Sequence, residues 1–130
     1  MNRMELEDRL VDFAAQILRL ANQLANYSGA SYYANQMIRS SGSSALNYGE
    51  AQAGESTRDF IHKNKVVLKE LKETMICLKV IRKANLHKLE EEMATVYKEN
   101  NELISIFVAT IKTAEKNQAK KDFEGYPNQI

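Results

Sequence analysis

The chain has 130 residues, enough for one domain, with 44% hydrophobic residues and a net charge of +1 at pH 7. It carries no apolar run long enough to cross a bilayer, and the four acidic residues near its N-terminus do not fit a signal peptide. Its single cysteine, Cys77, excludes an intramolecular disulfide. We therefore expect a cytoplasmic protein in a reducing compartment.

The first apolar pattern runs from Met4 to Tyr27 and predicts a helix. Its apolar residues recur at alternating intervals of four and three, which is typical of a helix packed in a bundle. This stripe consists of Leu6, Leu10, Phe13, Ile17, Leu20, Leu24 and Tyr27. A second stripe beside it consists of Val11, Ala14, Leu18, Ala21 and Ala25. Ser28 and Gly29 are expected to end the helix, because glycine suits the left-handed position that follows a last turn.

The segment from Ser31 to Ala51 predicts a second helix, with Ser31 as its N-cap and Ala53-Gly54 at its end. Residues 39–45 are rich in serine and include Gly42, which costs about 1 kcal/mol relative to alanine inside a helix. We interpret these small side chains as a place where two helix backbones come close. The alternative is a loop that splits the segment.

A third helix is predicted from Ser56 to about Ala84-Asn85, with Asp59 placed to complete a capping box. Its inward positions are Asn64, Val67, Leu68, Leu71, Met75, Leu78, Ile81 and Arg82.

A fourth helix is predicted from about Leu86 to Gln118. Its inward positions are Leu89, Met93, Val96, Asn100, Leu103, Phe107 and Ile111. Residues 103–111 are apolar on nearly every side, which indicates either a second copy packed against them or a broad core face. Four helices with short connections predict an all-α, antiparallel up-down-up-down bundle over residues 1–119, followed by a flexible tail over 120–130.

No residue pattern marks an active site. Four-helix enzymes with two metal ions use Glu-x-x-His pairs, whereas His62 follows Asp59 at that spacing and His87 has no acidic residue there. Cys77 has no metal-ligand partner at a suitable spacing and reads as a buried, inert thiol. Phosphate-binding glycine motifs are absent. We expect a non-enzymatic protein that needs no cofactor or metal.

Positive charge gathers on the third predicted helix. Residues 61–88 hold eight basic and two acidic side chains, a balance of +6. The lysines that share one helical face are Lys65, Lys69, Lys72, Lys79 and Lys83. Such a row can follow the phosphates of a nucleic acid, although lysines are also common on a solvated helix face. No aromatic residues are interleaved with these lysines in the sequence.

Several polar residues fall on or near the predicted inward stripes. Arg39, Asn47 and Glu50 lie close to one stripe of the second helix, and Glu70 flanks the stripe of the third. A buried charge needs a partner. We therefore hypothesise that Arg39 pairs with Glu70 or Glu50 and that this polar network fixes helix register. An exposed helix face is the alternative.

Residues 36–56 and 58–81 resemble the bacterial four-helix-bundle proteins encoded in intervening sequences of large-subunit ribosomal RNA genes. The features that carry the resemblance are Arg39-Ser40 followed by small residues, Asn47 with Glu50, Asp59-Phe60, and Leu68 with Glu70. Ala51 departs from the pattern, in which glycine commonly follows the glutamate.

The resemblance implies a left-handed antiparallel bundle, a homopentamer and no enzymatic activity. A related protein, the accessory factor of diversity-generating retroelements, is a basic pentamer that binds nucleic acid and a reverse transcriptase. By analogy, we expect an oligomer that binds nucleic acid, or an enzyme acting on it, through the lysines of the third helix. The alternative is a structural or protein-interaction module that uses the apolar face of the fourth helix.

Overall fold

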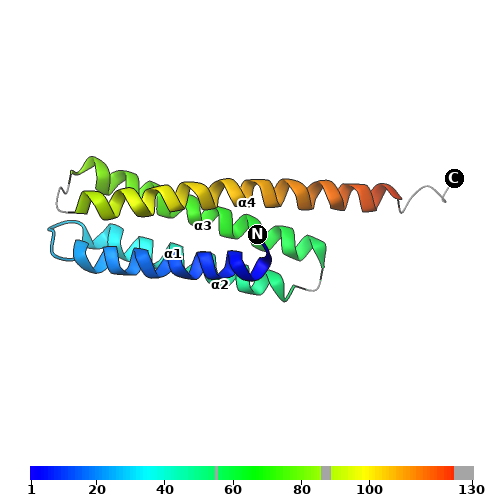
Figure 1. Ribbon diagram of the computed structural model, residues 1–130, viewed down its shortest axis with the longest axis horizontal. Helices are drawn as coiled ribbons and strands as arrows, with labels where there is room; N and C mark the ends of the chain where they lie inside the picture. Colours follow the sequence, from blue (N-terminus) through cyan, green and yellow to red (C-terminus); the bar gives the residue numbers. More distant parts are fainter. Residues whose placement is uncertain (55, 86–88, 125–130) are drawn as a thin grey trace.

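The computed structural model describes residues 1–54, 56–85 and 89–124. Over these residues the chain forms α1 (Arg3–Leu24), α2 (Ser31–Gln52), α3 (Thr57–Lys83) and α4 (Glu90–Glu124). Figure 1 shows the helices packed side by side, each running opposite to the one before it. The predicted all-α up-down bundle is confirmed. Within the described part of the chain, no helix is long and apolar enough to span a bilayer.

The core is built from the inward stripes that the sequence spacing predicted, whereas the second stripe of the first helix lies mostly outside it, with Val11 and Leu18 exposed. All seven inward positions predicted for the fourth helix are buried, six of them in α4 and Leu89 just before it. In the first stripe predicted for the first helix, only Tyr27 is partly exposed, and it lies beyond the end of α1. In α3 the exceptions are Arg82, which is exposed, and Leu68, which is partly exposed. Tyr48 of α2 is also buried and meets Phe107 of α4 edge to face, with ring centroids 5.4 Å apart. Its burial raises the pKa of the Tyr48 hydroxyl.

The helix ends differ in part from the sequence prediction. Asn2 caps α1 in a capping box with Glu5, two residues before the predicted start at Met4. Ser31 was predicted as the N-cap of α2, but Ala30 holds that position without a side-chain hydrogen bond. The prediction was wrong because the connection from α1 already ends in a helical conformation at Ala30, leaving Ser31 inside the first turn.

Further along the chain, the Ser56 hydroxyl accepts a hydrogen bond from the backbone N–H of Asp59 at 3.1 Å, as one half of the predicted capping box requires. Asn85 has a φ of 64°, the left-handed conformation expected after α3.

The start predicted for the fourth helix, Leu86, lies outside the described residues. That helix was expected to end at Gln118, but α4 continues to Glu124, so residues 119–124 are helical. Residues 125–130 of the predicted tail lie outside the described residues.

The serine-rich middle of α2 is continuous helix rather than a loop. Ser40, Ser41 and Ser44 are buried, so their small size does permit close packing. A Cβ atom added to Gly42, in contrast, would meet no neighbouring heavy atom within 4 Å. The interpretation of close helix approach therefore holds for the serines and is wrong for Gly42.

Asn100 places a buried amide between α4 and α3. With its amide turned to suit its neighbours, Nδ2 donates to the carbonyl of Leu71 at 3.1 Å and Oδ1 accepts from the N–H of Met75 at 3.0 Å. These two backbone groups lie four residues apart on α3. The amide can meet both only at one relative position of the two helices, so it helps to fix their register.

Replacing Gly42 with alanine should stabilise the fold by about 1 kcal/mol, because alanine favours the helix and the site has room for a methyl group. Urea unfolding followed by circular dichroism measures this change. The matched control is Gly29→Ala, which should destabilise by about 1 kcal/mol because Gly29 has a φ of 82°. Destabilisation by Gly42→Ala would show that something outside this chain packs against Gly42.

Candidate nucleic-acid interface

The lysines predicted to share one face all lie on the outer surface of α3, which we call the lysine face. They are Lys65, Lys69, Lys72, Lys79 and Lys83, and each is exposed. They lie there because the opposite side of α3 is occupied by core residues such as Val67, Leu71 and Leu78. At 1.5 Å per residue, the row extends for about 27 Å along the helix.

Most of the positive charge on this face has no acidic partner. Lys65 pairs with Glu115 of α4 at 3.3 Å, but both side chains are about half exposed, so water screens the pair. Among residues 1–54, 56–85 and 89–124, no carboxylate forms an ion pair with the other four lysines. The field of this row therefore reaches solvent.

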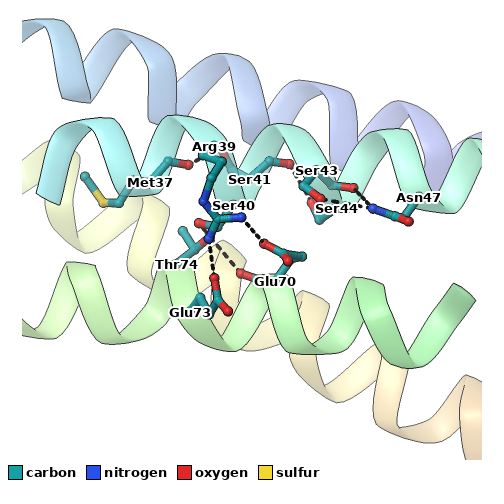
Figure 2. Close-up of polar contacts among 10 residues, drawn as sticks. All are labelled: Met37, Arg39, Ser40, Ser41, Ser43, Ser44, Asn47, Glu70, Glu73 and Thr74. Carbon is teal, nitrogen blue, oxygen red and sulfur yellow. Dashed lines mark hydrogen bonds and ion pairs between the residues drawn. The ribbon is translucent and has the colours of Figure 1, made fainter.

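The two glutamates of α3 are engaged from the neighbouring helix, as Figure 2 shows. Arg39 of α2 donates from Nη1 to Glu70 Oε2 at 3.2 Å and from Nη2 to Glu73. The hydrogen bond to Glu73 is the largest influence raising the pKa of Arg39 above its usual value, and the charge of Glu70 adds to it. Arg39 thus offsets two negative charges that would otherwise weaken the lysine face.

A buried hydroxyl pair lies beside this ion-pair cluster. Ser40 Oγ and Thr74 Oγ1 are 2.6 Å apart, and Thr74 also donates to the carbonyl of Glu70 at 3.0 Å. Ser40 is therefore the donor to Thr74. Together with Arg39, this pair ties α2 to α3 at one level of the bundle (Figure 2).

The other polar residues proposed for this network lie elsewhere. Glu50 accepts a hydrogen bond from Lys63 at 2.5 Å, and both groups are exposed to solvent. Asn47 donates to the carbonyl of Ser43, one turn back in its own helix. The structure brings Arg39 and Glu70 together and does not bring Asn47 or Glu50 to them. Glu73 was missed as a partner of Arg39, although it lies one helical turn from Glu70 in the sequence.

The lysine face is hollowed in its first half, between residues 65 and 76. This shallow hollow of about 460 Å³ is lined by Lys65, Lys69, Lys72 and Glu73 together with the apolar side chains of Leu68 and Ile76. Ile76 is 58% exposed. The sequence pattern of charge did not reveal this apolar lining.

Among the described residues, no three His, Cys, Asp or Glu side chains gather in a way that could hold a metal ion. Cys77 is buried, and this burial raises the pKa of its thiol. His62 is exposed, and His87 lies outside the described residues.

A larger groove of about 820 Å³ lies at the end of the bundle where α4 extends beyond the start of α1 (Figure 1). It is bordered by Arg3, the end of α2, the start of α3 and one side of α4. The Arg3 guanidinium covers the ring of Phe60, 4.8 Å from its centroid.

For the apolar stretch of α4 the sequence left two alternatives, a second copy packed against it or a broad core face, and within this chain most of the stretch belongs to the core. Leu103, Phe107 and Ile111 are buried, and Ile104 and Ile106 pack against the core while partly exposed. The large apolar side chains that are exposed on the other helices are Met4, Val11, Leu18, Tyr32, Ile38, Leu46, Ile76 and Val80. Exposed large apolar side chains are therefore more numerous on α1, α2 and α3 than on α4, where Phe123 is exposed.

Comparisons with known proteins agree with this architecture. A family model described as 23S rRNA-intervening sequence protein matches residues 3–109. A crystal structure from Bacteroides thetaiotaomicron VPI-5482, described as a protein with unknown function from the S23 ribosomal protein family, is similar with a TM-score of 0.76. The two chains share 27% identity over 82% of this chain and 98% of that chain. Among curated proteins, no match was found.

A double-mutant cycle with Arg39→Met and Glu70→Gln should give a coupling energy of about 1 kcal/mol, because the Glu70 side chain is only 10% exposed. The same urea unfolding measures it. The control cycle uses Arg58 and Asp122, whose exposed side chains are 3.8 Å apart and should couple by less than about 0.5 kcal/mol. Equal coupling in the two cycles would contradict a special role for Arg39.

Proposed function

Because this chain belongs to the 23S rRNA-intervening sequence protein family, we propose that it is a non-enzymatic, oligomeric helical bundle that binds nucleic acid through its lysine face. The observation that supports this most is the row of exposed lysines, four of them without an acidic partner among the described residues. A fixed row of cations on a rigid helix is a surface that phosphates can follow.

Binding of this kind is electrostatic. Each lysine that meets a phosphate releases a condensed counterion, so affinity falls as salt concentration rises. Lysine ammonium groups do not distinguish bases through phosphate contacts, so recognition at these five positions is independent of sequence. The rigidity of α3 contributes because its lysines keep their spacing without an ordering cost for the backbone.

We propose assembly of identical copies through α1. Its exposed apolar residues Met4, Val11 and Leu18 recur every seven residues, so they form a stripe along the helix. The family resemblance points to five subunits. A ring would place several lysine faces within reach of one nucleic acid and raise the overall affinity through multivalency.

A second candidate function is a purely structural or protein-interaction module. The exposed apolar residues of α1 and α2, including Leu18 at 47% and Leu46 at 72%, support it. This function would need no contribution from the lysine face.

Reversing three lysine charges, with Lys69→Glu, Lys72→Glu and Lys79→Glu, should weaken binding of a labelled oligonucleotide at least tenfold at low salt. It should also reduce the slope of log affinity against log salt by about two, because three phosphate contacts are lost. Fluorescence anisotropy at two or more salt concentrations measures both. The control, Lys112→Glu with Lys116→Glu and Lys120→Glu on exposed positions of α4, makes the same change in net charge. If both triple variants lose affinity equally, the lysine face is not the site.

Light scattering should give a mass several times that of the 14.8 kDa chain. Leu18→Glu should lower that mass by placing a charge in the stripe of α1, whereas Phe123→Glu, at an exposed position near the end of α4, should leave it unchanged. A wild-type protein of single-chain mass would end the proposal of assembly. An unchanged mass for Leu18→Glu would exclude α1 as the interface.

A further inference from the structure

We propose that the lysine face binds single-stranded nucleic acid in preference to the double helix, because exposed apolar and aromatic side chains lie among its lysines. This inference rests on the proposed function and names the class of ligand. A surface that meets phosphates alone needs only charge. The lysine face offers a second kind of surface, suited to unpaired bases.

The first part of that surface is the hollow between Lys65, Lys69 and Lys72. Its lining includes the apolar residues Leu68 and Ile76, and 58% of the surface of Ile76 is exposed. An exposed isoleucine amid ammonium groups has no role in phosphate contact. It offers an apolar surface against which a base can lie while the surrounding lysines hold the adjoining phosphates.

The second part comes from α2 and follows from helix register. Arg39 of α2 contacts Glu73 of α3. Tyr32 lies seven residues before Arg39, two turns back on the same side of α2, and Val80 lies seven residues after Glu73. Figure 1 shows that α2 and α3 run antiparallel. Counting from the Arg39–Glu73 contact, this register brings Tyr32 to the level of Val80, an exposed residue of α3.

Tyr32 is suited to serve as a stacking platform. It is 63% exposed, and its ring meets the edge of Tyr33 with centroids 5.1 Å apart. Tyr33 in turn packs against the core. The Tyr32 ring therefore has a core-packed neighbour on one part of its surface and is otherwise largely open to solvent. Its level in the bundle is near that of Lys79 and Lys83, whose ammonium groups can meet the phosphates of a stacked nucleotide.

These two places distinguish the forms of nucleic acid. In duplex nucleic acid the bases are paired and stacked on one another. The outer surface of a protein helix such as α3 therefore meets only the phosphates and sugars of a duplex. A single strand exposes the faces of its bases, which stack on aromatic and apolar side chains with little regard to sequence. A strand running along α3 would pass the hollow and then Tyr32.

The test compares a fluorescein-labelled 20-nucleotide strand that forms no hairpin with the same strand annealed to its complement, both by anisotropy at 50 mM salt. Wild-type protein should bind the single strand at least tenfold more tightly. Tyr32→Ser combined with Ile76→Ser should remove most of this preference and leave duplex affinity within about twofold, because the lysines are intact. Tyr32→Phe should keep the preference, since phenylalanine still stacks.

The control is Phe123→Ser, which removes another exposed aromatic residue, also near lysines, and should leave both affinities unchanged. Circular dichroism checks that each variant is folded. Equal affinity for the two forms, tighter duplex binding, or a preference that survives the double variant would overturn this inference and leave the proposed function standing.

Two further outcomes concern the proposed function itself. If wild-type protein binds neither the single strand nor the duplex at 50 mM salt, both the proposed function and this inference are wrong. A labelled acidic peptide of alternating glutamate and leucine blocks serves as the competing probe. If it binds, Ile76→Ser weakens it, and neither nucleic acid binds, the hollow is a peptide site and the inference is wrong.

Discussion

Each helix of this bundle can bury only one side, and that constraint arranges the rest of the molecule. Burial of apolar side chains is the main favourable contribution to folding, so every helix turns its apolar stripe inward. In α3 the inward positions Val67, Leu71 and Leu78 are fully buried. The helical repeat then carries the lysines to the opposite side. The lysine face is thus positioned by the core.

A short polar layer adds specificity to this apolar packing. Arg39 joins α2 to two glutamates of α3, the Ser40 hydroxyl meets Thr74, and Asn100 reaches backbone groups of α3 from α4. Apolar stripes alone allow helices to slide by one turn at small cost, whereas these polar groups lose their partners if the helices slide. The layer also offsets the two negative charges nearest the lysines. The ion pairs of Arg39 with Glu70 and Glu73 therefore both hold α2 against α3 and reduce the negative charge near the lysines.

The same register has a consequence at the surface. Tyr32 belongs to α2, and in the sequence it is 33 residues from Lys65 and 51 from Lys83. Because α2 packs antiparallel against α3, Tyr32 lies at the level of Val80. Exposed aromatic and apolar groups thereby accompany a row of cations that, in sequence, has no aromatic neighbours. A surface with both features differs in kind from a solvated lysine stripe.

The sequence by itself determined the helical class, the inward positions and the segment that carries positive charge, because all three depend on spacing within one helix. For this reason all seven inward positions predicted for the fourth helix are buried in the structure. Details that depend on neighbouring chain segments were not accessible: the capping position at Ala30, the open space around Gly42, and the continuation of α4 to Glu124. The tertiary structure alone decided that Glu73 shares Arg39 and that Tyr32 lies at the level of Val80. Both depend on how two different helices meet, and periodicity within a helix carries no information on the level at which they do so.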